Sequence, residues 1–119
     1  MLKEKISAFI EQVRSINGVA ACALVSRDGI IAGKSFDRDL NEPWFGALSA
    51  TILASAESVG SIIRMKSMKS VMIKAEDSSI IIMGAGENFL VAAIIADKAD
   101  PAKIHLQMLA VTQKIAEAM

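Results

Sequence analysis

The spacing of hydrophobic positions divides the chain into helical and extended segments. Near the start, apolar residues recur at the three- and four-residue intervals of one buried helix face, at Leu2, Ile6, Phe9, Ile10, Val13 and Ile16. Shorter, almost continuous apolar runs between turn-forming residues are typical of buried strands. The whole pattern predicts helices over residues 2–16, 42–64 and 101–118, and strands over residues 19–26, 30–35, 70–75, 79–83 and 89–96.

Turn-forming and capping residues mark where these segments begin and end. Asn17-Gly18 ends the first helix, because both residues tolerate the left-handed backbone conformation that closes helices. Asp28-Gly29 favours a tight hairpin, because glycine readily adopts the positive φ that such a turn needs. Asn41 and Asp100 each precede a proline in the first turn of a predicted helix, which identifies both as N-caps.

The predicted order is α-β-β-α-β-β-β-α in a single domain over residues 1–119. Short turns between consecutive strands imply antiparallel pairing, so the fold class is α/β of the α+β kind. We expect a three-layer sandwich in which a five-stranded antiparallel sheet carries helices on both faces. The third strand is expected at a sheet edge. There Lys69 and Lys74 would guard the edge, whereas Val71, Met72 and Ile73 would favour pairing with a strand of another chain.

The helix predicted over residues 42–64 has two adjacent stripes of different size. One stripe is large and apolar, and consists of Phe45, Leu48, Ile52, Val59 and Ile62. The other is made of small residues, namely Ala47, Thr51, Ala54 and Ser58. We expect the large stripe to lie on the helix's own sheet. Small residues let a second backbone approach closely, so we expect the small stripe to touch another helix.

Composition points to an oligomer and away from nucleic acid. The hydrophobic fraction is 53%, and a domain of this size keeps about a third of its unfolded surface exposed. Some apolar side chains should therefore lie outside, where large apolar patches usually mark protein interfaces. The 13 basic and 13 acidic residues balance, whereas nucleic-acid binders usually carry a basic excess.

The chain lacks the usual marks of export or membrane insertion. Its longest apolar run, residues 89–96, is far short of the ~20 residues that span a bilayer. The first residues do not form the apolar core of a signal peptide. Cys22 is the single cysteine, so an internal disulfide is impossible and a reducing compartment fits. We expect a soluble, cytoplasmic protein with no stable membrane insertion.

Little in the sequence indicates catalysis. Residues 29–35 resemble a phosphate-binding loop, but three residues separate the glycines where the motif has four, and the segment lies in a hairpin. His105 has no cluster of further metal ligands around it. Cys22 lies within a buried strand, where a thiol has a raised pKa and little reactivity. We therefore expect no catalytic residue, no cofactor, no metal and no enzymatic activity.

Three polar or aromatic features leave their roles open. A stretch without acids contains Arg64, Lys66, Lys69 and Lys74. It is either a solvated helix end, where cations suit the dipole, or a surface for an acidic partner or anionic lipid. Of the clustered acids, Asp28 belongs to the hairpin turn. Asp37, Asp39 and Glu42 lie with Arg38 in what is either a self-compensated solvated loop or a protein contact. Trp44 is either an interface anchor or a packing residue. Candidate partner-binding residues are Trp44, Arg64, Lys66 and Lys69.

The segment 16–32, in which a Gly-Val strand start is followed by an Asp-Gly hairpin, resembles the opening of the roadblock/LC7 family. The resemblance continues through the helix rich in small residues, the three-strand meander and the last helix. It implies pairing through the middle helices and third strands into one ten-stranded sheet. The matching interface positions are Ala47, Thr51, Ala54, Ser58, Val71 and Ile73. The loop 36–41 and Pro43-Trp44 match no family feature.

The resemblance further implies a homodimeric adaptor, scaffold or regulator of a Ras-like small GTPase, of the kind associated with prokaryotic GTPases. The residues doing chemistry would then largely be those of the GTPase. The alternative is a small-molecule or lipid-sensing domain of profilin-like or PAS-like build, whose pocket the apolar residues would line. Few polar residues are placed to orient a ligand among the apolar strands, which weighs against that alternative.

Overall fold

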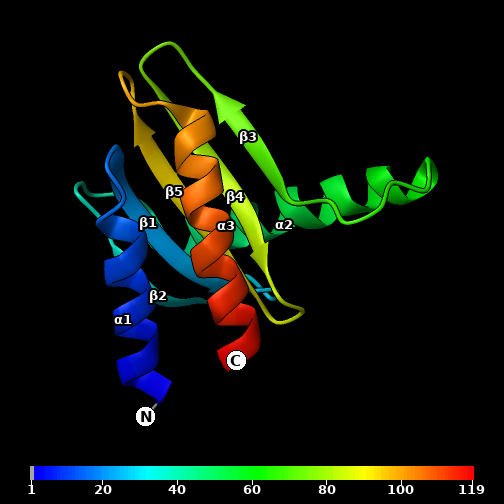
Figure 1. The fold of residues 1–119 in the computed structure, drawn as a ribbon, viewed down its shortest axis with the longest axis horizontal. Helices are drawn as coiled ribbons and strands as arrows, with labels where there is room; N and C mark the ends of the chain where they lie inside the picture. The colour runs from blue at the N-terminus through cyan, green and yellow to red at the C-terminus, as the bar shows by residue number, and fades with distance from the viewer. Residues whose placement is uncertain (1) are drawn as a thin grey trace.

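The computed structural model describes residues 2–119, and the order of helices and strands predicted from the sequence is confirmed (Figure 1). The elements are α1 (Leu2–Arg14), β1 (Val19–Ser26), β2 (Ile31–Ser35), α2 (Glu42–Ile62), β3 (Ser70–Lys74), β4 (Ser78–Ala85), β5 (Phe89–Ala96) and α3 (Pro101–Ala118).

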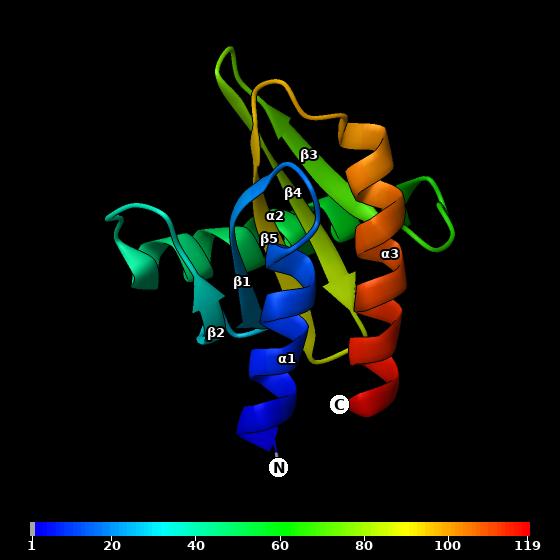
Figure 2. The ribbon, with the colours of Figure 1, turned by 60° about the vertical axis from the view of Figure 1, so that its left-hand side comes forward.

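The strands form one antiparallel five-stranded sheet in the order β2-β1-β5-β4-β3. Helices α1 and α3 cover one face of this sheet, whereas α2 crosses the opposite face (Figures 1 and 2). The predicted three-layer α+β sandwich is therefore confirmed. The edges of the sheet are β2 and β3, which confirms the predicted edge position of the third strand.

Each face of the sheet has its own hydrophobic core. The core beneath α1 and α3 is the larger, and its buried residues include Ile10, Val13, Leu24, Met83, Ile104, Met108 and Ile115. The core beneath α2 consists of Ala23, Val25, Ala50, Leu53, Ile82, Leu90 and Ala92. The central strands β1 and β5 are buried on both faces, which explains why their sequences are almost continuously apolar.

The caps and turns form as their residues predict. The side chain of Asn41 accepts a hydrogen bond from the backbone N–H of Trp44 at 3.1 Å, and Asp100 accepts one from Ala102 at 3.1 Å. Gly29 has a φ of 90°, and the backbone N–H of Ser26 donates to the carbonyl of Ile30 at 2.8 Å. These contacts close the hairpin between β1 and β2 and begin α2 and α3 where the sequence places them.

Several boundaries differ from those predicted, and α1 and α2 both end early. The N–H of Ile16 donates to the carbonyl of Val13 at 3.1 Å, a three-residue contact that tightens the chain after α1 ends at Arg14. Ile16 nevertheless stays buried in the core. The predicted second helix extended to Arg64, but the φ of 59° at Arg64 lies in the left-handed region, so α2 ends at Ile62.

The strand boundaries also shift by a residue or two. β4 is longer than predicted, because Gly84 pairs with Leu90 and Ala85 pairs with Phe89 in the ladder to β5. The prediction of a turn at Gly84 and Ala85 was wrong, because glycine is compatible with a strand where a neighbouring side chain needs the space. β2 begins at Ile31, because Ile30 is occupied in closing the hairpin.

Candidate interaction surface

Helix α2 packs on the sheet through small residues and Leu53. Its buried residues are Gly46, Ser49, Ala50, Leu53 and Gly60. At the start of the helix the hairpin between β1 and β2 lies directly against it, because a Cβ added at Gly46 would stand 2.6 Å from the carbonyl oxygen of Gly29. The layer between them combines Ala50 and Leu53 of the helix with Ala23, Val25, Ile82, Leu90 and Ala92 of the sheet.

The expectation that the large stripe of α2 faces its own sheet was therefore wrong for three of its members. Leu48, Val59 and Ile62 are 51%, 64% and 81% exposed. Phe45 and Ile52 are half-buried beside the α2-side core, and the ring of Phe45 meets that of Phe36 edge-on at 5.7 Å. Val59 and Ile62 lie towards the end of α2 that extends beyond the edge of the sheet (Figure 1), and Leu48 is on the side of the helix away from the sheet.

The outward side of α2 is uncharged and largely apolar. Exposed residues spaced at three or four positions form what we call the α2 outer face: Trp44, Leu48, Thr51, Ser55, Val59 and Ile62. The small residues Ala47, Ala54 and Ser58 are exposed beside this row. The Thr51 hydroxyl donates to the carbonyl of Ala47 at 2.9 Å within the helix, so it adds little polarity. A solvent-facing helix surface normally carries charges, and this one resembles a buried surface.

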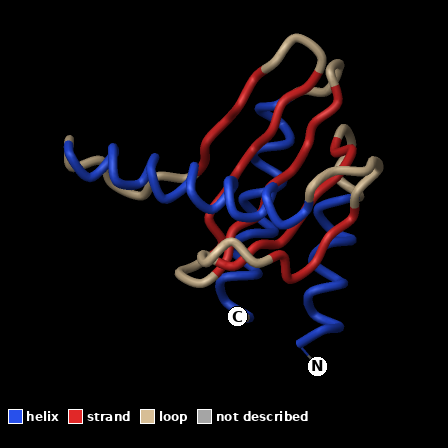
Figure 3. The backbone as a smooth tube through the Cα atoms, turned by 180° about the vertical axis from the view of Figure 1, so that it is seen from behind, coloured by secondary structure: helices blue, strands red, loops and turns tan. Residues whose placement is uncertain are grey.

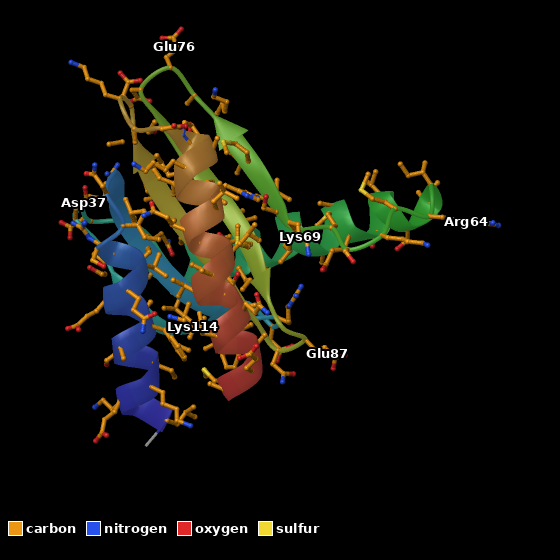
Figure 4. The ribbon with its side chains drawn as sticks, viewed as in Figure 1. Asp37, Arg64, Lys69, Glu76, Glu87 and Lys114 are labelled. Carbon is orange, nitrogen blue, oxygen red and sulfur yellow. The ribbon has the colours of Figure 1, made fainter. Side chains whose placement is uncertain are left out.

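The second half of α2 projects past β3, beyond the edge of the sheet (Figures 1 and 3). Arg64 lies at the far tip (Figure 4). The chain then returns towards β3 as residues 63–69, held to the helix by a hydrogen bond of 2.9 Å from the N–H of Met65 to the carbonyl of Gly60. Ile63 and Met65 are exposed on this projection. The projection thus adds apolar surface beyond the domain's own sheet.

Strand β3 is open on the same side. It pairs with β4 from Ser70 opposite Met83 to Lys74 opposite Ser79, and no described residue pairs with its outer edge. Val71 packs against the α2-side core, so the odd-numbered residues of β3 face α2. The opposite face is identified by the Ser70 hydroxyl, which lies 2.7 Å from Nε2 of His105 on α3.

The six predicted interface residues lie on these two surfaces. Val71 and Ile73 lie on β3 and point towards the α2 side, whereas Ala47, Thr51, Ala54 and Ser58 lie along the exposed side of α2. They do not form one compact cluster within a single subunit. Ala47 lies against the hairpin at Gly29, roughly 16 Å along the helix axis from Ser58.

The predicted partner-binding residues are divided between the two ends of α2. Trp44 is 63% exposed in the first turn, and Arg64 lies at the tip. A helix of 21 residues is about 30 Å long, so one subunit does not bring the two together. Lys66 and Lys69 are exposed on the returning segment. Lys69 also borders a hollow that includes Arg27 and Glu57.

Arg27 is a structural contact that the sequence analysis missed. Its Nη1 donates to Oε1 of Glu57 at 3.0 Å, and its Nη2 donates to the carbonyl of Gly86 at 2.8 Å. Gly84 leaves the space for this side chain, since a Cβ there would stand 3.0 Å from Nη2. Arg27 therefore ties the first hairpin to α2 and to the turn between β4 and β5. Its neighbours in the sequence predicted only a turn, because both partners of Arg27 lie far away along the chain.

The acidic loop before α2 is largely compensated within the chain. Asp37 accepts two hydrogen bonds from the guanidinium of Arg38, at 2.6 and 2.9 Å. These bonds, and then the charge of Arg38, hold the pKa of Asp37 below its usual value. Glu42 forms an ion pair with Lys34. Both contacts favour the interpretation of this segment as a solvated, self-compensated loop.

The groups considered for chemistry are placed for packing. Residues 29–35 form a hairpin turn and the edge strand β2, a context unlike that of a phosphate loop, which joins a strand to a helix. Cys22 is fully buried, and burial raises the pKa of its thiol to about 11 against a smaller opposing effect of Arg14. Within residues 2–119, no three or more His, Cys, Asp and Glu side chains gather in a way that could hold a metal ion.

By length and composition alone, α2 would also pass for a membrane-spanning helix. Its first half is the packing layer of the α2-side core through Ala50 and Leu53. α2 is therefore a packed helix of this domain, and its outer face is exposed.

An α+β sandwich with an exposed apolar helix and an open strand edge on the same side defines a protein-interaction domain. Comparison with known proteins gives the family. The Roadblock/LC7 domain model matches residues 5–96, and the chain belongs to that family. No sequence among the curated proteins matches the chain significantly.

Solved structures agree on the fold. The gliding protein MglB of Thermus thermophilus has a TM-score of 0.85 at 16% identity, with 98% of this chain and 91% of that chain covered. MglB in a tetrameric arrangement has a TM-score of 0.86 at 15% identity, covering 96% and 87%. The profilin of Schizosaccharomyces pombe has a TM-score of 0.72 at 15% identity, covering 93% and 96%. At these identities the likeness concerns the fold alone.

Proposed function

We propose that the protein is a non-catalytic homodimeric adaptor that binds a Ras-like small GTPase and modulates its nucleotide cycle or localisation. The observation that carries the proposal is the adjacency of two uncovered surfaces, the α2 outer face and the open edge of β3. Both surfaces reach the β3 edge of the sheet, and α2 projects past that edge (Figure 1). One second copy of the chain is able to cover both.

A two-fold axis perpendicular to the sheet and beside β3 uses both surfaces together. The two β3 strands then pair antiparallel, and the sheet continues from one copy into the other. The projecting half of each α2 comes to lie beneath the sheet of the other copy. Small side chains such as Ala54 and Ser58 allow the two helices to approach closely, and Thr51 and Ala47 extend the contact along α2. Val71 and Ile73 line the same layer from β3.

The same symmetry also addresses the separation of the candidate partner-binding residues. The two α2 helices run antiparallel, so the Trp44 end of one helix is directed towards the Arg64 end of the other. Trp44, Arg64, Lys66 and Lys69 are then candidates for one composite partner surface built from two copies. Aromatic and arginine side chains at such positions are frequent anchors of protein interfaces.

The GTPase partner is supported by membership of the Roadblock/LC7 family. Cys22 is buried within β1, and Nε2 of His105 lies 2.7 Å from the Ser70 hydroxyl. In this proposal the GTPase keeps its own hydrolytic residues, and the adaptor acts by holding one conformation of the GTPase in preference to another.

The competing function is a small-molecule sensor of profilin-like build. Its support is a groove of about 450 Å³ between the β1–β2 hairpin and the start of α2, lined in part by Ile30, Ile31, Pro43 and Ala47. A ligand pocket needs a few convergent polar groups to orient its occupant. Here Lys34 and Glu42 pair with each other instead. Native mass spectrometry of the purified protein separates the two functions, because the sensor should retain a co-purified small molecule.

Self-association is tested by light scattering coupled to size exclusion at micromolar protein. We expect a dimer for the natural chain and a monomer for Ala54→Glu, which places a charge on the exposed side of α2. Ala8→Glu on α1 is the matched control, because Ala8 is also an exposed helical alanine but lies on the other face of the sheet. A monomeric natural chain, or equal masses for all three proteins, would contradict the proposal.

The GTPase is tested by capture from lysate of the source cell loaded with GDP or with a non-hydrolysable GTP analogue. We expect a Ras-like GTPase in one loaded state and a changed rate of single-turnover GTP hydrolysis when the purified partners are mixed. Trp44→Ala should weaken capture, whereas Ala8→Glu should not. Capture of no such GTPase in either state counts against this part of the proposal and leaves the dimer standing.

A further inference from the structure

The two ends of β3 carry opposite charge. Arg64, Lys66 and Lys69 precede the strand, and no acid occurs between Glu57 and Glu76. Glu76 and Asp77 follow the strand in the turn to β4. In Figure 4, Lys69 lies beside the start of β3, Arg64 lies further out on the projection, and Glu76 lies on the turn at the opposite end of the strand. We call these groups the basic flank (residues 64–69) and the acidic flank (residues 76–77).

The ion pairs of the described residues leave these charges out, although the charge of Asp77 contributes, after the hydrogen bond and charge of Asp37, to the raised pKa of Arg38 in the same subunit. Lys66, Lys69 and Glu76 are exposed. Asp77 accepts a long hydrogen bond of 3.4 Å from the hydroxyl of its neighbour Ser78. Charged residues at a sheet edge usually oppose pairing with another chain. Lys74 adds one positive charge beside the two acids at the end of β3, so that end keeps a net negative charge while the start of the strand is positive. The effect of the charges therefore depends on how a second strand is oriented.

Antiparallel pairing of β3 with its own copy places the start of each strand beside the end of the other. If the two-fold axis passes at Met72, the middle residue of β3, then Ser70 lies opposite Lys74 of the second copy and Lys69 opposite Ala75. The basic flank then lies at the same end of the pair as Glu76 and Asp77 of the second copy, which follow Ala75 in the turn to β4. Parallel pairing would instead set the two basic flanks together.

We infer that the basic and acidic flanks of β3 select a second copy of this chain as the occupant of the β3 edge and fix its antiparallel orientation. The inference rests on the proposed homodimer, and it adds the residues that determine orientation and partner choice. The flanks attract in the antiparallel pair at both ends, because the two-fold axis repeats each contact. In the parallel pair the flanks repel each other. They also repel any other edge strand whose orientation places like charges side by side.

The test uses full-length chains with the charge of one flank reversed. The basic-flank variant is Lys66→Glu/Lys69→Glu and the acidic-flank variant is Glu76→Lys/Asp77→Lys. Each variant has the same sign on both flanks, so we expect its homodimer dissociation constant at low ionic strength to rise at least about tenfold. An equimolar mixture of the two variants should regain the association of the natural chain, because each supplies the charge that the other lacks.

A third protein carries all four reversals and keeps the experiment decisive if one double variant folds poorly. Its flanks are again opposite in sign, so it should dimerise like the natural chain. Lys5→Glu/Lys114→Glu is the charge-matched control on α1 and α3, and its association should stay unchanged. The difference between each double variant and the natural chain should shrink at about 0.5 M salt, where exposed charges are screened.

Self-association that is equal in the natural chain and both double variants overturns the inference and leaves the proposed function intact. Failure of the mixture and of the fourfold variant to recover does the same. A monomeric natural chain removes the proposed function itself. Vesicles containing phosphatidylserine provide one more arm. If the basic-flank variant dimerises normally but no longer pellets with these vesicles, the cations serve a lipid surface and the inference is overturned.

Discussion

Replacing Val59 by alanine should weaken self-association by about thirtyfold without unfolding the subunit. Val59 is 64% exposed on the α2 outer face, in the half of the helix that projects beyond the sheet. Truncating a side chain that is already mostly in water removes little packing within one subunit. The free energy of unfolding of the isolated subunit should therefore change by no more than about 0.5 kcal/mol.

The expected size of the effect follows from the exposed area. Val59→Ala removes two methyl groups, each worth about 0.8 kcal/mol when it leaves water completely. The exposed share of 64% is the part that a second copy is able to bury, so each copy loses about 1 kcal/mol. A two-fold interface contains the change twice. The total of about 2 kcal/mol corresponds to a dissociation constant roughly thirty times larger.

Sedimentation equilibrium over a range of concentrations measures this constant, and circular dichroism checks the fold. Leu2→Ala is the matched control, because Leu2 is 58% exposed at the start of α1, on the opposite face of the sheet. A dissociation constant for Val59→Ala within threefold of the natural value would refute the assignment of the α2 outer face to the dimer. Equal weakening by Leu2→Ala would show that the effect follows general surface hydrophobicity.

Two further predictions concern the domain itself. Gly46→Ala should lower the free energy of unfolding by about 1–2 kcal/mol, because overpacking against the carbonyl of Gly29 outweighs the gain in helix propensity. Gly60→Ala should instead raise the free energy of unfolding by up to about 1 kcal/mol, because a Cβ there would stand at an ordinary contact distance of 3.5 Å from Met65. Urea unfolding at fixed protein concentration distinguishes the two signs. Stabilisation by both substitutions would contradict the packing argument. The thiol of Cys22, whose pKa burial raises to about 11, should react with iodoacetamide at pH 8 in urea but hardly in the native protein; rapid native labelling would show that β1 opens.

The order of elements was predictable from the sequence because its signals are local. The Asp28-Gly29 hairpin and the caps at Asn41 and Asp100 depend on neighbouring residues, and each forms as its residue types require. The edge position of β3 also followed, because a meander of consecutive strands leaves its first strand at the outside unless another element pairs with it. Long-range contacts carried less signal. Arg27 meets Glu57 only after the hairpin has folded onto α2.

The faces of α2 were not predictable from residue size. Periodicity locates a buried face when the opposite face is polar, and α2 has few charged positions with which to mark an outside. Large side chains were therefore assigned to the sheet, whereas Ala50 and Leu53 occupy that place and Leu48 and Val59 point outward. The contacts with Val25, Ile82 and Leu90 of the sheet decide which residues of α2 fit into this layer. Complementary volumes in two layers are a tertiary property.

The connection between α2 and β3 shows where this domain departs from the arrangement most favourable for one subunit alone. Arg64 and Ser67 have φ values of 59° and 53°, a conformation that costs non-glycine residues about 1–2 kcal/mol each. A shorter turn would end α2 near the edge of the sheet and would need neither residue. The longer path lets the helix overshoot β3 and return, which keeps apolar side chains such as Ile62 and Ile63 in water. In the proposed dimer the sheet of the second copy would lie over the projection and shield these apolar side chains. The interaction surface therefore depends on the path of residues 63–69 as much as on any side chain of α2.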